Sequence, residues 1–171
     1  QTITGTKVGI EDFLSGFGSG GIMAALYEVV YRKRYYQLNQ KSPYPSGLAI
    51  LISLFFIAAF LIWGVGFSSF KASMVSMVFI SAVILYFRGD LWRQALVTAA
   101  GMTLVSLLVY YPIIFVFPGW VDATYDSGLS GVRFTGIPIE ELMFWFMAGF
   151  MWGPFYKYWK NEYEEKVQRV T

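Results

Sequence analysis

Five long apolar segments, separated by short polar stretches, run along the 171-residue chain. A helix needs roughly 20 apolar residues to cross a bilayer core of about 30 Å. Each segment is close to that length. The pattern therefore predicts an all-α integral membrane protein, a single domain of residues 1–171 with about five transmembrane helices. The predicted spans are residues 12–31, 48–67, 70–87, 91–117 and 139–159.

Composition agrees with that prediction. Apolar residues make up 56% of the chain and charged residues only 14%, against roughly 25% charged residues in soluble domains. A large soluble core is the alternative, but five buried helices would leave too little polar chain to cover them. The net charge of +2 is small and scattered, so nothing indicates a nucleic-acid partner.

Lysine and arginine are distributed unevenly between the two predicted sides. Ten of the 13 fall on one side, in residues 32–41, 88–93 and 157–169, and three fall on the other, at Lys7, Lys71 and Arg133. Because basic loops stay in the cytoplasm, we expect a cell-membrane protein with a non-cytoplasmic N-terminus and a cytoplasmic C-terminus. The first and fifth spans then run in the same direction.

An acidic motif opens the last span, and a weaker copy opens the first. Residues 136–141 read Gly-Ile-Pro-Ile-Glu-Glu, and residues 9–12 read Gly-Ile-Glu-Asp. A shift of 129 residues aligns the two repeats, residues 9–31 and 136–159. It pairs Glu11 with Glu140, Asp12 with Glu141, Phe17 with Phe146 and Tyr27 with Tyr156. Parallel copies indicate pseudo-symmetry about an axis along the membrane normal.

Helical spacing extends each acidic pair into a face. Glu141 shares its face with Phe144, Trp145, Trp152 and Tyr156, whereas Asp12 shares its face with Gly16, Ser19, Gly20, Met23 and Tyr27. One face carries aromatic residues and the other carries small residues, so together they would form an apolar groove with acidic residues at its end. Ordinary helix packing, with carboxylates that only complement the helix dipole, is the alternative interpretation.

Such a groove suits a particular chemistry. Burial penalises the charged form of a carboxyl, which favours a protonated general acid. Aromatic faces would stabilise a carbocation formed when that acid protonates an alkene. The chain has no histidine and no cysteine, so proton transfer would use carboxylates, tyrosines or lysines. A magnesium site for a prenyl diphosphate is a competing interpretation, but no D-D-x-x-D spacing accompanies the acids, and no metal site is predicted.

Four smaller features carry expectations of their own. Gly16-x-x-x-Gly20 and Gly149-x-x-x-Gly153 predict close helix approach. Glu28 is expected to extend toward the cytoplasmic surface, with a buried pairing to an arginine as the alternative. The turn of residues 88–90 is expected to be solvated, and the polar tail of residues 160–171 to be a fraying helix.

The run Pro138-Ile139-Glu140-Glu141 leading into an aromatic helix, with its weaker copy, resembles the membrane lycopene cyclase domain family of the heterodimeric or fused type. The resemblance implies cofactor-free, acid-initiated, non-redox cyclisation of the ends of linear lycopene, a carotenoid and long isoprenoid. It implies four proton donors and acceptors, Glu140, Glu141, Glu11 and Asp12. The residues expected to bind substrate are Phe144, Trp145, Trp152, Tyr156, Phe17 and Tyr27.

The chain departs from the family pattern in two ways. Gly9 precedes the first acidic pair where the motif has proline, and two helices that the family places ahead of it are not in the sequence. A hetero- or homo-oligomer would supply such helices. The alternative function is a non-catalytic membrane scaffold of the same fold, one that binds a carotenoid or isoprenoid lipid or serves as a subunit of a larger complex.

Overall fold

The computed structural model describes residues 10–31, 35–37, 44–119 and 130–164. These residues form five α-helices, a 3-10 turn and two small antiparallel sheets. The helices are α1 (Ile10–Tyr31), α2 (Gly47–Trp63), α3 (Ser69–Phe87), η1 (Gly89–Leu91), α4 (Trp92–Val116) and α6 (Ile139–Lys160). The strands are β1 (Tyr35–Gln37), β2 (Arg133–Phe134), β3 (Ile137–Pro138) and β4 (Glu162–Glu164).

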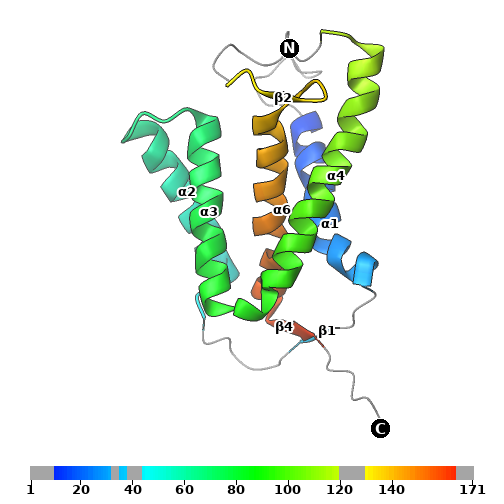
Figure 1. Ribbon diagram of the computed structural model, residues 1–171. Helices are drawn as coiled ribbons and strands as arrows, with labels where there is room; N and C mark the ends of the chain where they lie inside the picture. The colour runs from blue at the N-terminus through cyan, green and yellow to red at the C-terminus, as the bar shows by residue number, and fades with distance from the viewer. Residues whose placement is uncertain (1–9, 32–34, 38–43, 120–129, 165–171) are drawn as a thin grey trace.

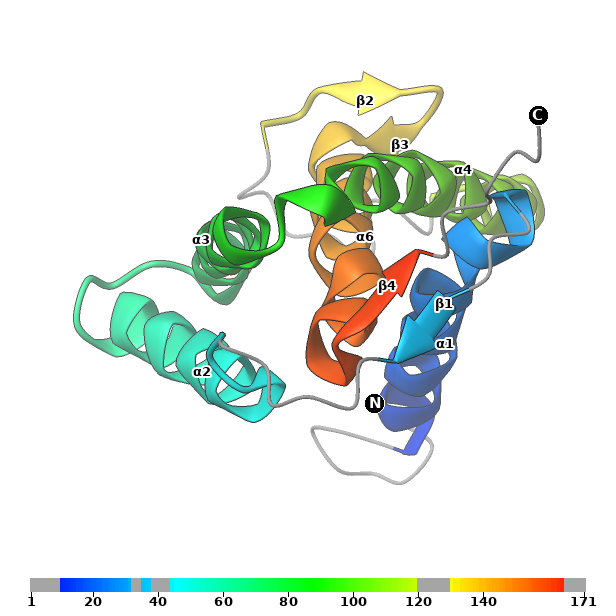
Figure 2. The ribbon, with the colours of Figure 1, turned by 90° about the horizontal axis from the view of Figure 1, so that it is seen from below.

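Helix α6 lies at the centre of the bundle. Figures 1 and 2 show α3 on one side of it and α4 and α1 on the other, with α2 packed outside α3. Helices α1 and α6 both begin at the same end of the molecule and run in the same direction (Figure 1). Both copies of the acidic motif therefore stand at one end of the bundle.

Local signals explain where several helices begin and end. The Ser46 hydroxyl caps α2 by accepting a hydrogen bond from the Ala49 N–H at 3.2 Å, and the Ser68 hydroxyl does the same for α3. Helix α6 ends at Asn161, which adopts a left-handed conformation with φ 52°. That conformation commonly terminates helices, and here it turns the chain into β4.

Two of the described helices are long and apolar enough to cross a membrane, over Ser69–Phe87 and Gly89–Val116. Helix α2 is also apolar but has only 17 residues. Large apolar side chains are exposed on the outer helices, including Phe56 and Trp63 of α2 and Phe115 of α4. The five apolar segments thus correspond to five helices, whereas five membrane spans stay a prediction.

Two small sheets add to the predicted all-α architecture, and they were not predicted because strands of two or three residues leave no periodic pattern. Strands β1 and β4 pair with Tyr36 opposite Tyr163, so Glu162–Glu164 are extended and not a fraying helix; the rest of the tail lies outside the described residues. Strands β2 and β3 form a tight hairpin. Its two central residues, Thr135 and Gly136, both have positive φ, as hairpin turns of this kind require. The hairpin leads directly into α6.

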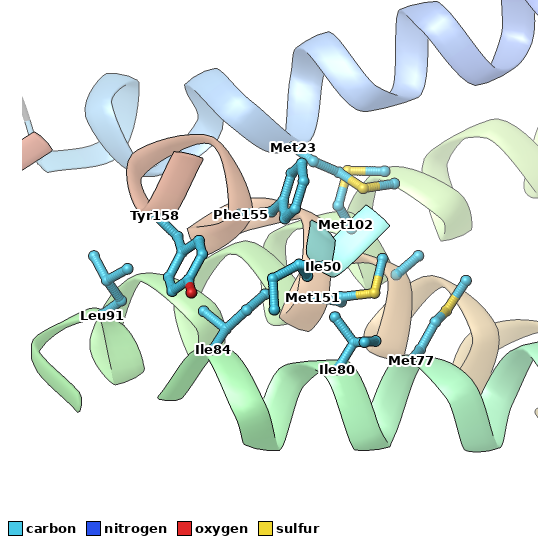
Figure 3. Close-up of a cluster of buried hydrophobic side chains, with 11 residues drawn as sticks. Met23, Ile50, Met77, Ile80, Ile84, Leu91, Met102, Met151, Phe155 and Tyr158 are labelled. Carbon is cyan, nitrogen blue, oxygen red and sulfur yellow. The ribbon is translucent and has the colours of Figure 1, made fainter. Parts of the chain in front are cut away.

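The core lies between α3 and α6 and receives one buried side chain from each of the other helices. Figure 3 shows Met77, Ile80 and Ile84 of α3 facing Met151, Phe155 and Tyr158 of α6, with Met102, Met23, Ile50 and Leu91 around them. Four methionines in this cluster suit the irregular spaces between crossing helices, because the thioether chain is flexible.

The two glycine pairs differ in structure. A Cβ on Gly149 would lie 2.7 Å from the carbonyl oxygen of Thr98, and one on Gly153 would lie 2.6 Å from the Thr98 Cβ. The predicted close approach is therefore confirmed for α6 against α4. It was wrong for Gly16 and Gly20, where an added Cβ meets nothing within 4 Å, because that side of α1 faces open space.

Candidate functional site

The acidic motif occupies the first turn of α6, directly after the hairpin. Glu140 accepts a hydrogen bond at Oε1 from the backbone N–H of Ser130, at 2.6 Å. Its Oε2 is buried and has no hydrogen-bond partner among the residues that the structure describes. Glu140 is thus tied to the loop before the hairpin.

Glu141 is tied to two helices. Its Oε1 accepts one hydrogen bond from the hydroxyl of Tyr110 in α4 and a second, at 2.9 Å, from Nε1 of Trp145, one turn further along α6. Two donors on a single oxygen fix the orientation of the carboxyl group and leave its other oxygen to carry a proton.

A groove of about 430 Å³ lies between α1 and α6; we call it the α1–α6 groove. Gly16, Ser19, Gly20 and Met23 line it from α1, Phe144, Trp145, Ala148 and Trp152 from α6, and Met77 from α3. The small face and the aromatic face expected from helical spacing meet here. Its volume lies in the usual range for small-molecule sites, about 300–1,000 Å³.

A second cavity, of about 440 Å³, lies between α1 and α4; we call it the α1–α4 cavity. Its wall is mostly aliphatic and carries the hydroxyl groups of Ser19, Ser106 and Tyr110. Trp145 and Ser19 line both this cavity and the groove. The remaining lining residues are Leu14, Gly18, Ile22, Met102, Val105, Val109 and Ile113.

The structure brings together only part of the predicted site. Phe144, Trp145 and Trp152 line the α1–α6 groove, whereas Phe17 is 75% exposed and Tyr156 is 43% exposed, and neither lines the groove or the α1–α4 cavity. Tyr27 is buried in the bundle. Glu11 and Asp12 lie in the first turn of α1, but their side chains lie outside the described part of the chain.

Sequence reasoning missed Tyr110 and Ser130. For Tyr110 a signal exists, since Gln94, Thr98, Ser106 and Tyr110 recur at multiples of four residues in an otherwise apolar segment. Polar residues four apart lie next to each other on a helix surface, and Gln94, Thr98 and Ser106 are buried. For Ser130 no such signal exists, because its contact is made by the backbone of an irregular loop.

The opposite end of α6 holds a buried lysine. Lys157 is 2% exposed and binds the carboxylates of Glu28 in α1 and Glu162 in β4, the latter at 2.9 Å. The side chain of Glu28 is 41% exposed, so nothing contradicts the expectation that it extends toward the surface. It also pairs with a buried cation, which is a lysine and not the arginine of the alternative. Glu28 and Lys157 are 129 residues apart, which is the offset of the repeat.

The expectation of a solvated turn was wrong for Arg88, whereas Gly89 and Asp90 of the same turn are exposed. Its side chain is 1% exposed and binds Asp90 through two hydrogen bonds, at 2.9 and 2.8 Å, as well as the carbonyl oxygen of Glu162 at 2.7 Å. The ring of Tyr163 stacks against its guanidinium. Burial lowers the pKa of Arg88, but the hydrogen bonds and charge of Asp90 outweigh it, so the pKa is raised.

Comparison with known proteins is informative at the level of the family. The family model described as lycopene cyclase matches residues 68–159, which is more than half of the chain. The match runs from the start of α3 to the end of α6 and so contains Tyr110, Glu140, Glu141 and Trp145. No curated protein matches the chain, and no solved structure does. The chain belongs to the lycopene cyclase family.

Proposed function

We propose that the chain catalyses a lycopene cyclase reaction, the acid-initiated and non-redox closure of the ends of a linear carotenoid. The observation that supports this most is the placement of Glu141. Its carboxyl is held by Tyr110 and Trp145 beside two apolar cavities. A long apolar substrate and a proton donor could meet there without a metal or cofactor.

The reaction needs one proton transfer to the substrate and one proton transfer from it. A carboxyl O–H protonates the terminal carbon–carbon double bond, and a second double bond of the same chain attacks the cation to form the new ring bond. The ring cation then loses a proton from an adjacent carbon to a carboxylate. Substrate and product have the same atoms and electrons. Aromatic rings near the cation stabilise it through their quadrupoles, a role suited to Trp145 and Phe144.

The remaining acids have assigned places in this proposal. Glu140 and Glu141 are the donor and acceptor of the described site, and Glu11 and Asp12 of the first repeat are their counterparts across the α1–α6 groove. Phe144, Trp145 and Trp152 bind the substrate.

The same proposal places all five helices in a cell membrane. The two helices of spanning length and the exposed phenylalanines and tryptophan of α2 support it, because a soluble monomer rarely exposes a large contiguous apolar patch. The distribution of lysine and arginine supports a non-cytoplasmic position for the acidic end.

The test uses carboxamide variants in a host that makes lycopene but has no cyclase. We expect Glu140→Gln and Glu141→Gln each to lower ring formation at least about 100-fold, the scale of a lost general acid. Glu162→Gln removes a carboxylate at the far end of α6 and is the matched control, which should still cyclise. Pigment analysis and the level of inserted protein are the measurements.

Normal cyclisation by both variants would disprove the acid mechanism. If the wild-type chain binds a carotenoid but forms no rings, and binding survives both substitutions, the chain is the non-catalytic carotenoid-binding scaffold.

A further inference from the structure

We propose that the α1–α4 cavity, and not the α1–α6 groove, holds the end of the substrate that reacts, and that Tyr110 carries the proton from Glu141 to it. This inference rests on the proposed function. It assigns a subsite for a branched isoprenoid end and a role to a tyrosine of α4.

The first argument is the position of the hydrogen-bonded acid. Both partners of Glu141, Tyr110 and Trp145, line the α1–α4 cavity, whereas only Trp145 lines the groove. Glu141 itself lines neither. The Tyr110 hydroxyl is therefore the group that joins the carboxyl to a cavity wall, and the cavity it joins is the one between α1 and α4.

The second argument is the shape of the two ligand parts. A linear carotenoid has methyl-branched, flexible ends and a flat conjugated middle. The α1–α4 cavity is walled by aliphatic side chains such as Leu14, Ile22 and Val105, which suit a branched end that must fold on itself. The groove presents the rings of Phe144 and Trp152, which suit a flat polyene. Trp145 lines both and lies where the two parts of the chain would join.

The proton step balances. In the reacting state the hydrogen bond between the two groups is reversed from the one described above: Glu141 is protonated at Oε1 and donates to the Tyr110 oxygen, and the Tyr110 O–H points into the cavity. The hydroxyl hydrogen of Tyr110 then moves to the terminal alkene carbon while its oxygen takes the hydrogen of the Glu141 carboxyl. Tyr110 ends neutral, Glu141 ends as a carboxylate, and the substrate becomes the cation that closes the ring. The Trp145 Nε1–H remains bonded to Oε1 of Glu141 and stabilises the charge formed there.

Three glycines of α1 provide a matched test of the subsite. Gly18 lines the α1–α4 cavity, Gly16 lines the groove and Gly21 lines neither, and an added Cβ at each of them meets nothing within 4 Å. A leucine at position 18 therefore fills the α1–α4 cavity, a leucine at position 16 fills the groove, and a leucine at position 21 fills neither. Each change also improves helix propensity by a similar amount.

We expect Gly18→Leu to lower kcat for lycopene cyclisation roughly tenfold or more, because the reacting end is displaced from the acid. Gly16→Leu should mainly raise KM, and Gly21→Leu should behave as wild type. The assay uses the full chain in membranes with added lycopene. The proposed subsite is wrong if Gly18→Leu keeps the kcat of Gly21→Leu, or if Gly16→Leu lowers kcat as much as Gly18→Leu.

Adjacent tyrosines provide the test of the proton path. Tyr110→Phe should lower kcat roughly tenfold or more and shift the pH profile of kcat, which a loss of packing alone would not do. Tyr111, whose hydroxyl bonds to Thr135 at 2.5 Å, is the control, and Tyr111→Phe should keep the wild-type profile. An unchanged profile in Tyr110→Phe overturns the relay. Failure of the wild-type chain to cyclise would instead overturn the proposed function.

Discussion

At the scale of single residues, Glu28 and Lys157 bear on the predicted repeat. They occupy equivalent positions, 129 residues apart, and they bind each other. Residues that face a pseudo-two-fold axis meet their own counterparts, so this contact agrees with the predicted pseudo-symmetry of α1 and α6. Two identical charges would repel at such a place, whereas a glutamate and a lysine attract.

Loss of Lys157 should destabilise the protein. Lys157→Met leaves the carboxylates of Glu28 and Glu162 without their cation, and breaking a buried pair costs about 3–5 kcal/mol. Because Glu28 is itself 41% exposed, we expect a smaller loss, about 2 kcal/mol in the free energy of unfolding. Denaturation in detergent measures it. Lys160→Met, at an exposed position of the same helix, is the control, and equal stability of the two variants would contradict the expectation.

At the scale of elements, apolar length and helical spacing predict much of what the structure contains. The lengths of the apolar segments predict five helices. The spacing of residues within them predicts the face of small residues on α1 and the aromatic face on α6 that meet in the α1–α6 groove. The α1–α4 cavity could not be predicted in the same way. It depends on which side of α4 turns toward α1, and the polar residues of α4, such as Ser106 and Tyr110, do not indicate which helix they face.

The packing of α6 on α4 depends on glycine, which gives an element-scale prediction. An added Cβ on Gly149 meets the rigid backbone of Thr98 and Ala99, so Gly149→Ala must push the helices apart. Overpacking of this kind costs about 1–3 kcal/mol. Gly20→Ala, at the equivalent position of the first repeat, has open space and should be neutral or slightly stabilising. Thermal unfolding of both variants checks this, and equal loss of stability would contradict it.

At the scale of the whole molecule, the two ends of the bundle have different chemistry. One end carries the acidic motif, the hairpin and the residues that bind Glu141; the other carries the salt bridges of Arg88 and Lys157 and the β1–β4 sheet (Figure 1). Both basic residues belong to the basic side used to predict orientation. They are buried and paired, yet the remaining lysines and arginines keep the same bias, so the predicted orientation does not depend on them.

Because the chain contains no cysteine, a single introduced thiol can report which end faces which side of the membrane. Val132 is exposed beside the hairpin at the acidic end, and Lys160 is exposed at the end of α6. We expect a membrane-impermeant maleimide to label Val132→Cys in intact cells and to label Lys160→Cys only after the membrane is opened. Both sites are exposed in the folded chain, so a difference in labelling reports the side of the membrane and not burial. The reverse pattern would place the acids in the cytoplasm, and labelling of both sites in intact cells would mean that the chain does not separate its ends across a bilayer.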